Sequence, residues 1–261
     1  GRCSIESFDR SSGTMRSSFV FLLLTLFSAP TTPLAGQIPA SSNDLRVNGS
    51  VRPADPNPQF LGSTSSRFSV GGFLGYQDGM SFQAFGVARN FAQGFPLQAR
   101  FRLARTSVEP GSAPKARKIF INDATNGTPK EAGRTWDMGL DGLYPVGART
   151  NFFGGVRYSS FTANFKYVGG NEDFDVTSKH WGLAAGLEAE FPMNSKMSLL
   201  ISGGGEYFFS SRLTGHDTSY SPDGDNVNPR KDYSYSDADG AVDQPVLRPV
   251  ALIGFSYRLG R

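Results

Sequence analysis

Residues 245–259 read PVLRPVALIGFSYRL, and from Leu247 onward they separate into two faces of opposite character. One face carries Leu247, Pro249, Ala251, Ile253, Phe255, Tyr257 and Leu259, and the other carries Arg248, Gly254, Ser256 and Arg258. A period of two over this length predicts a β-strand. The stretch is also longer than the roughly 9 to 11 residues that a tilted strand needs to cross a bilayer.

Seven further segments alternate in the same way. They are 67–77, 80–91, 97–108, 134–144, a segment that begins at Asn151, 179–191 and 196–210. Asp78 and Gly79 separate the first two segments, and Asp-Gly between alternating runs is a strong hairpin signal. The sequence therefore predicts a chain of eight antiparallel strands.

The connections between these segments differ in length in an ordered way. The long connections 109–133 and 211–244 and the medium one, 168–178, all follow odd-numbered strands, so they lie at one end of an up-and-down arrangement. Short turns at one end and long loops at the other are typical of outer-membrane barrels. A secreted, lipocalin-like soluble barrel stays as an alternative, but its apolar faces would point inward around a ligand.

The end of the chain carries a further likeness. Residues 252–259 are similar to the C-terminal signal of outer-membrane barrels, a polar residue followed by x-Gly-x-x-aromatic-x-aromatic, with Leu252 and Leu259 departing from it. Together with the two-faced strands and a stretch near the N-terminus that is typical of a signal peptide, this likeness makes the chain resemble a known family. It is the family of small outer-membrane barrels that includes the transmembrane domain of outer membrane protein A. The resemblance implies an all-β, eight-stranded antiparallel up-and-down transmembrane β-barrel over 67–261.

The first 66 residues are expected to lie outside the barrel. Residues 15–36 contain a basic start at Arg16, an apolar run over 19–27 and then small residues, which indicates a cleaved signal peptide. Residues 1–14 are expected to be an upstream extension, and 37–66, rich in Ser, Asn, Pro and Gly, a flexible periplasmic tail. Cys3 precedes the signal, so we expect a mature chain without thiols in the bacterial cell outer membrane.

If the apolar faces meet lipid, the opposite faces line the lumen. The lumen charge network is expected to contain Arg89, Arg100, Arg102, Asp137, Asp141, Arg157, Glu188, Glu190, Glu206, Arg248 and Arg258. Folding neighbouring strands together places Arg157 opposite Glu188 and Glu190. The outward aromatic residues expected at the membrane interfaces are Tyr76, Trp136, Tyr144, Trp181, Phe191, Phe255 and Tyr257. Eight strands leave an interior just wide enough for side chains, which favours a plugged barrel over a narrow pore.

Catalytic and metal chemistry find little support. Neither histidine belongs to a His-x-Ser pair of the kind that a lipid A deacylase needs, and we expect His180 at the membrane interface beside Trp181 and His216 in a loop. We predict no catalytic residues and no cofactor. The weak metal candidates are Asp237, Asp239 and Asp243, for which a solvated acidic loop is the simpler interpretation.

The sequence therefore predicts a non-enzymatic outer-membrane barrel with a structural role or a binding role for its loops, such as envelope integrity, adhesion or partner binding. A narrow channel for small solutes or ions is the alternative. Expected partners are outer-membrane lipid, the barrel-assembly machinery through the C-terminal strand, and an extracellular partner through 109–133 and 211–244, where Tyr220, Tyr233 and Tyr235 lie among charged residues. A net charge of +3 and dispersed basic residues argue against nucleic acid, and we expect a monomer.

Overall fold

The computed structural model describes residues 67–89, 95–121, 126–226 and 230–260, and the structural statements below refer to these residues. The expectations for 1–14, 15–36 and 37–66 lie outside the described residues. No helix among the described residues is long and apolar enough to cross a membrane.

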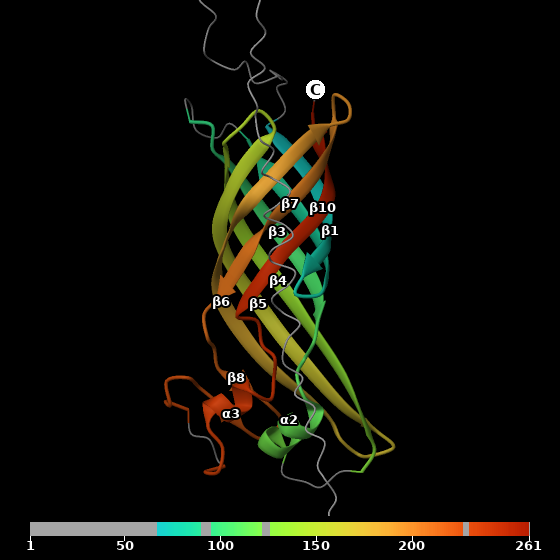
Figure 1. Ribbon diagram of the computed structural model, residues 1–261, viewed down its shortest axis with the longest axis vertical. Helices are drawn as coiled ribbons and strands as arrows, with labels where there is room; N and C mark the ends of the chain where they lie inside the picture. The colour runs from blue at the N-terminus through green and yellow to red at the C-terminus, as the bar shows by residue number, and fades with distance from the viewer. Residues whose placement is uncertain (1–66, 90–94, 122–125, 227–229, 261) are drawn as a thin grey trace, which may run out of the picture. The chain divides into compact units, whose positions relative to one another are not determined.

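Eight antiparallel strands close into a barrel (Figure 1). They are β1 Phe68–Gln77, β2 Met80–Ala88, β3 Gln98–Val108, β4 Thr128–Pro145, β5 Thr150–Val168, β6 Asp173–Pro192, β7 Met197–Phe208 and β10 Leu247–Leu259. Strands β1 to β7 each pair with the next, β7 pairs with β10, and β10 returns to β1. The predicted fold class, a closed eight-stranded antiparallel barrel, is confirmed.

The C-terminal strand closes the barrel because it pairs on both of its edges. On one side Phe68 of β1 lies opposite Leu259, and on the other Met197 of β7 lies opposite Tyr257. Closure leaves these strands without a free edge, so their backbone groups are satisfied inside the sheet. The predicted hairpin turn lies between β1 and β2, and the φ of 56° at Asp78 is the left-handed value that such a turn requires.

Strands β4, β5 and β6 are longer than the sequence alternation predicted. Strand β4 begins at Thr128 instead of 134, and β5 and β6 continue until only 169–172 separate them. The prediction of a medium connection at 168–178 is therefore wrong. The reason is that the period of two continues past Tyr158, but the apolar residues change to the opposite face. The ends of these strands project beyond the barrel (Figure 1).

The two long connections are folded. The first contains α2, Ala113–Phe120, and the second contains β8, Leu213–Thr214, β9, Ser219–Tyr220, and α3, Tyr235–Asp239. A bridge between Gly111 and Val242 joins them, and the Ser112 N–H donates to the Ala241 carbonyl at 2.9 Å. We term α2, α3, β8, β9 and the projecting ends of β5 and β6 the cap, which lies at the lower end of the barrel in Figure 1.

The cap has its own hydrophobic core. Buried side chains from both long connections and from β5 and β6 form it: Ala113, Ala116, Ile119, Phe120, Ile121, Phe161, Ala163, Phe165, Tyr167, Phe174, Val176, Leu213, Tyr220, Ala238, Ala241 and Val242. Burial of this much apolar surface is the main force that holds a small folded unit together. The described parts of the long connections are therefore a packed structure and not solvated loops.

Candidate functional site

Charged side chains fill the middle of the barrel lumen. Eight of those predicted to point inward are at most 4 % exposed: Arg100, Arg102, Arg157, Arg248, Asp137, Asp141, Glu188 and Glu206. They comprise four cations and four anions, so this part of the lumen has no net charge. Balance is required here, because an unpaired buried charge costs several kcal/mol.

Glu206 on β7 is the acceptor at the centre of this group. Its Oε1 accepts from Arg102 Nη2 and from Arg157 Nε, both at 2.8 Å. Its Oε2 accepts from Arg248 Nη2 at 3.0 Å and from the side-chain amide of Gln77. One carboxylate thus connects strands β1, β3, β5 and β10 across the lumen.

Asp141 on β4 is the second shared acceptor. It accepts from Arg157 Nη1 at 2.6 Å and from Arg100 Nε at 3.1 Å, and Arg102 Nε lies 3.4 Å from its Oδ2. Because Arg102 and Arg157 contact both Asp141 and Glu206, the two acceptors belong to a single network. Such a network rigidifies the interior only when its members are satisfied together.

The outer members extend the network in two directions. Arg248 Nη1 donates to Asp137 at 3.2 Å, on the side toward the cap, and Arg100 pairs with Glu188, on the side away from it. The predicted placement of Arg157 opposite Glu188 and Glu190 is wrong. The residue of β6 next to Arg157 is Gly182, so this long side chain reaches across the lumen instead of along the neighbouring strand.

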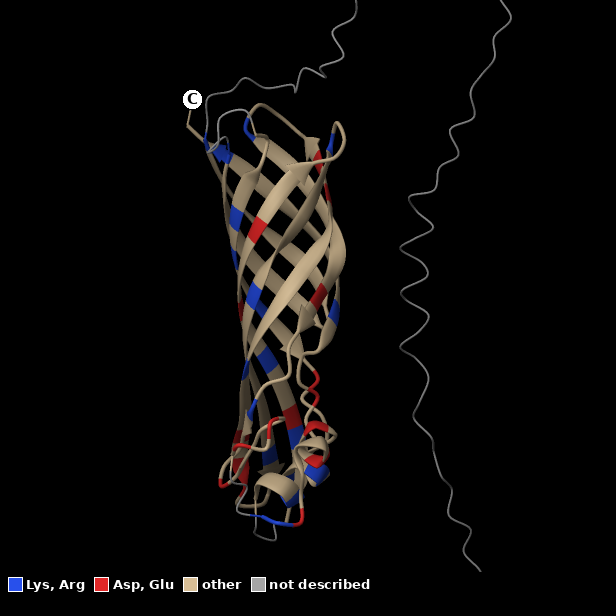
Figure 2. Ribbon diagram, turned by 90° about the vertical axis from the view of Figure 1, so that its left-hand side faces the viewer, with Lys and Arg blue, Asp and Glu red and all other residues tan. Residues whose placement is uncertain are grey.

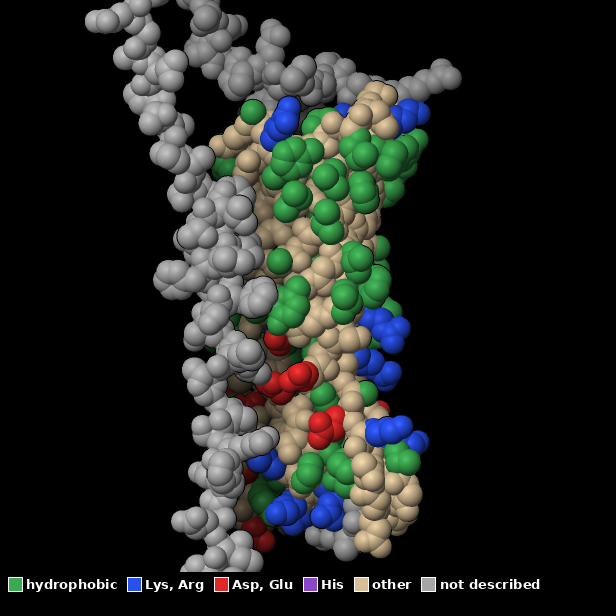
Figure 3. Space-filling view, turned by 45° about the vertical axis from the view of Figure 1, so that its right-hand side comes forward, with side chains coloured by type: hydrophobic (Ala, Val, Ile, Leu, Met, Phe, Trp, Pro, Cys, Tyr) green, Lys and Arg blue, Asp and Glu red, His purple; other side chains and the backbone are tan. Residues whose placement is uncertain are grey.

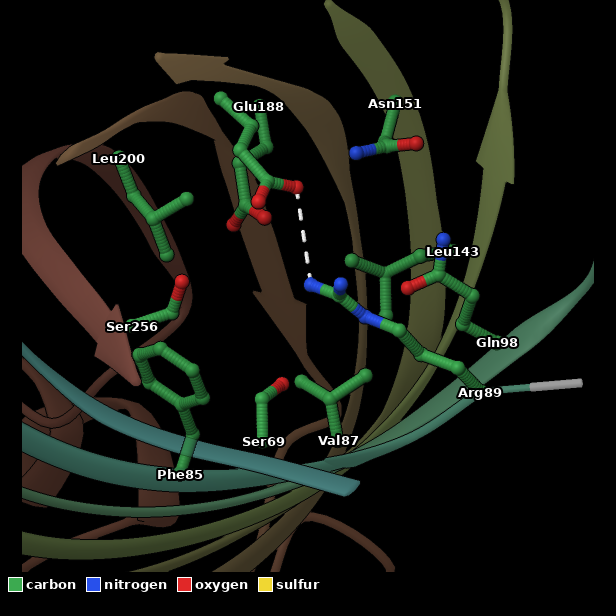
Figure 4. A pocket seen from close by; sticks show the side chains of 11 residues that line it. Ser69, Phe85, Val87, Arg89, Gln98, Leu143, Asn151, Glu188, Leu200 and Ser256 are labelled. Atoms are coloured by element: carbon green, nitrogen blue, oxygen red, sulfur yellow. Dashed lines mark ion pairs between the residues drawn. The ribbon is translucent and has the colours of Figure 1, made fainter. Parts of the chain in front are cut away.

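Three further predicted members form a separate group near the end of the barrel that is opposite the cap. Glu190 lies 3.6 Å from Arg89 and 3.2 Å from Arg258, and their side chains are 19 to 20 % exposed. A small cavity adjoins this group, and Figure 4 shows Arg89, Gln98 and Asn151 around it. The cavity has room for about one water molecule, far less than a ligand pocket.

The two histidines lie in different surroundings. His180 is 1 % exposed, and its ring nitrogens lie 2.6 Å from Ser178 Oγ and 2.9 Å from the Phe209 carbonyl. The prediction that it lies at the membrane interface is wrong, because even positions of β6 point into the barrel. His216 is in an exposed loop, 2.9 Å from Asp217.

Two of the acidic residues named as weak metal candidates make hydrogen bonds within the last connection. Within the described ranges no three His, Cys, Asp or Glu side chains gather as metal ligands. Asp237 accepts from the Ser234 backbone N–H at 2.7 Å at the start of α3, and Asp239 accepts from the side-chain amide of Gln244. The weak candidates Asp237, Asp239 and Asp243 are thus not brought together around an ion.

The outer face of the barrel is apolar. The seven outward aromatic residues are all exposed, from 37 % at Phe191 to 63 % at Trp181, together with aliphatic neighbours such as Leu140 and Ile253. Figure 3 shows hydrophobic side chains over the upper part of one face and charged ones toward the lower part. An apolar outside with a charged inside is the pattern of membrane barrels and the reverse of a soluble ligand-binding barrel.

We term the band of outward apolar residues around the barrel the apolar belt. Toward the cap it ends at three aromatic residues, Trp136, Tyr158 and Trp181, which we term the girdle. Tyr158 is in register with Trp181, and their ring centroids are 5.2 Å apart. Beyond the girdle the outward residues of β5 are polar, namely Ser160, Thr162, Asn164 and Lys166. The inward ones are then the buried residues of the cap core. Charged residues accordingly concentrate toward the cap end of the ribbon (Figure 2).

The tyrosines predicted to suit polar recognition pack within the cap. Tyr220 is 2 % exposed and meets the Phe120 ring edge-on at 5.6 Å. The Tyr235 hydroxyl donates to the Ser211 carbonyl at 2.7 Å, and burial raises the pKa of Tyr235. These residues hold the cap together, a role that the sequence patterns did not indicate.

Comparison with solved structures agrees with this architecture. A major outer membrane protein from Thermus thermophilus matches with a TM-score of 0.61 and 24 % identity, over 74 % of this chain and 98 % of that one. Neisserial surface protein A matches 74 % of this chain and 98 % of its own at 11 % identity, with a TM-score of 0.39. Ail, the attachment invasion locus protein of Yersinia pestis, matches 74 % of this chain and 97 % of its own at 13 % identity, with a TM-score of 0.38.

No family model matches the sequence, and neither does any curated protein. The fold is that of the small eight-stranded outer-membrane β-barrels, so the resemblance inferred from the sequence is confirmed at the level of fold.

Proposed function

We propose that this protein is a non-enzymatic outer-membrane barrel that does not conduct and that anchors a folded cap for a structural or partner-binding role. The observation that carries the proposal is the lumen filled by four arginines and four carboxylates, each at most 4 % exposed. A solute could pass only by breaking ion pairs in a region of low dielectric, which is costly.

The apolar belt supports a position in the bacterial outer membrane. Strands β1 and β10 begin and end at the side of the short turns, and the cap lies at the other side. In barrels of this kind, short turns are periplasmic and longer connections are extracellular. The partners that follow are lipid around the belt, the barrel-assembly machinery at β10, and an extracellular partner at the cap.

Conductance in planar bilayers tests the plugged lumen. The wild type is expected to give no steady current, because the Glu206 network closes the lumen. The double variant Arg248→Ser with Asp137→Ser removes one cation and one anion that pair at 3.2 Å, so it keeps the charge balance while it widens the lumen. It is expected to conduct more than the wild type. Large, stable channels in the wild type would refute the plugged barrel and support the channel alternative.

Replacement of the two long connections, which supply α2, α3, β8 and β9 of the cap, tests where binding resides. A variant in which short turns replace 109–127 and 211–244 is expected to insert as a heat-modifiable barrel, since the belt and lumen network remain. It should lose any adhesion to cells or surfaces that the wild type confers. Adhesion that survives without these connections would place the activity elsewhere, and a wild-type protein that stays monomeric without detergent would contradict the membrane position.

A further inference from the structure

Two outward-facing tryptophans mark the cap-side edge of the apolar belt, and each has a basic residue next to it. Arg134 precedes Trp136 by two residues on β4, and Lys179 precedes Trp181 by two residues on β6. All four side chains are exposed. Since both strands run in the same direction here, each basic residue lies one step beyond its tryptophan on the side of the cap.

A third basic residue joins this edge from the neighbouring strand. Arg105 on β3 is in register with Trp136, and its guanidinium carbon lies 5.5 Å from the centroid of the indole ring. A cation over an indole face is attracted by the ring and held in place there. Arg105 is exposed as well.

Strand β5 connects the two tryptophan strands with hydroxyl groups. Ser160 is in register with both Trp136 and Lys179, and Thr162 is in register with Arg134. Hydroxyl donors therefore lie between the basic side chains. We term Arg105, Arg134 and Lys179 the basic patch, which spans β3 to β6.

Among the residues that the structure describes, the basic patch has no acidic partner of its own. In the described part of the chain, no carboxylate lies within ion-pairing distance of its three members. Lys166, farther along β5, is by contrast paired with Asp173 at 2.9 Å. Three positive charges thus face outward uncompensated at the edge of the belt.

The patch is confined to one side of the barrel. At the same end, the last outward residues of β1, β2, β7 and β10 are apolar or aromatic, namely Tyr76, Met80, Tyr207 and Leu247. A general attraction to anionic surfaces would not require charges on only one side. The asymmetry indicates a local site.

We propose that the basic patch binds the headgroup phosphate of an anionic membrane lipid. The inference rests on the proposed function, because it requires the belt to lie in a bilayer. Outward aromatic residues mark the level of the lipid headgroups, and basic side chains just beyond them attract anionic lipid. Arginine suits a phosphate because its guanidinium donates two parallel hydrogen bonds. A lipid fits the patch better than a soluble anion, because the patch borders the exposed apolar belt, where acyl chains can lie beside the tryptophans.

The chain supplies its own probe for this site, because Trp136 and Trp181 are its only 2 tryptophans. Their fluorescence is quenched by lipids with brominated acyl chains when these lie against them. The full chain is reconstituted into phosphatidylcholine vesicles that contain either brominated phosphatidic acid or brominated phosphatidylcholine. The ratio of the two quenching efficiencies gives the lipid selectivity at the patch.

The wild type is expected to favour phosphatidic acid by about fivefold or more, and Arg134→Gln with Lys179→Gln should bring the ratio close to one. This variant leaves the Arg105–Trp136 contact intact. The matched control, Lys130→Gln with Lys166→Gln, removes the same charge beyond the patch and should keep the wild-type ratio. A wild-type ratio of one, or equal loss in both variants, would overturn the site.

Two further outcomes separate the possible failures. Inorganic phosphate at constant ionic strength should not reduce the quenching by phosphatidic acid, and full displacement would show a site for soluble anions instead. If brominated phosphatidylcholine does not quench either tryptophan, the belt is not in the bilayer, and the proposed function itself fails. A protein that is quenched without headgroup selectivity refutes the lipid site alone.

Discussion

Strands β5 and β6 cross two environments, and their apolar side chains lie on opposite faces in the two. Before the girdle, Val156 and Leu183 point outward and are 46 % and 52 % exposed, while Arg157 points inward. Beyond it, Phe161 and Val176 point inward and are fully buried, while the outward residues are polar. One continuous pleat thus serves a belt with a charged interior and a cap with an apolar interior.

The comparison shows that the surrounding medium, and not the strand, decides which face is apolar. Alternation alone establishes the pleat, because successive side chains point to opposite sides. In lipid the apolar residues must face outward, and in water they must pack inward. The position at which the apolar residues change face along an uninterrupted strand therefore marks the level at which the chain leaves the belt.

The largest expected effect is at the centre of the lumen network. Glu206→Ala would leave Arg102, Arg157 and Arg248 without their shared acceptor and should lower the free energy of unfolding by about 3–5 kcal/mol. Urea unfolding in lipid vesicles, followed by the heat-modifiable gel shift, measures it. Asp225→Ala, at an exposed position of the last connection, is the matched control. Equal unfolding midpoints would contradict the internal role of Glu206.

A pair of arginine substitutions on the same face of β6 tests the reversal directly. Leu187 is outward and 42 % exposed in the belt, so Leu187→Arg should cost about 2–4 kcal/mol, as for a cation placed on a lipid-facing surface. Thr177→Arg, outward and exposed beyond the girdle, should change the free energy of unfolding by less than about 0.5 kcal/mol. Similar costs at both positions would mean that the belt and the cap are surrounded by the same medium.

The crowded interior predicts a smaller effect at a glycine. A Cβ at Gly155 would overlap the Leu140 carbonyl oxygen and approach Asp141 Oδ1 at 2.5 Å. Gly155→Ala should therefore lower the free energy of unfolding by about 1–3 kcal/mol. Gly86→Ala, where a Cβ meets nothing within 4 Å, is the control and should be nearly neutral. If both variants unfold at the wild-type midpoint, the strands have room that the structure does not show.

The smallest expected effect is in the cap. Hydrogen bonds from the Ser234 hydroxyl and backbone N–H hold the pKa of the exposed Asp237 below its usual value. Because the folded-state pKa is lowered, this stabilisation is present above the ordinary pKa and is lost as pH falls through the lowered one. The protection factors of the α3 amides against hydrogen exchange should fall slightly over that acidic range in the wild type. In Asp237→Asn these protection factors should already be lower at neutral pH and change little with acid.

The sequence was sufficient to predict the barrel but not the cap. Strand positions followed from outward residues such as Trp136 and Ile253, since a period of two is a local property. The cap does not follow from the alternation, because 109–133 and 211–244 lack a sustained period of two and resemble loops. A usable signal was present in β5, where apolar residues move to odd positions at Phe161, Ala163 and Phe165. Its partners come from distant connections, which periodicity alone does not identify.

Ion pairing was predictable in kind but not in detail. Charges at inward positions of Arg100 and Asp141 indicated a network, and these two residues do pair. The partners of Arg157 depended on which carboxylates a long side chain reaches across a closed lumen. The amphipathic ring of His180 favours a membrane interface, whereas the pleat of β6 directs this side chain into the barrel.

The bridge between Gly111 and Val242 also constrains the order in which the molecule assembles. One partner follows the third barrel strand, and the other precedes the last one, so four of the eight barrel strands, β4 to β7, lie between them in the chain. Contacts between such distant segments form late, because closing a long loop costs entropy before any contact is gained. The cap is therefore expected to be completed late, once strands β4 to β7 have brought its two connections together. Before the two connections meet, aromatic residues of the cap core such as Phe120 and Tyr220 lack the partners that the other connection supplies.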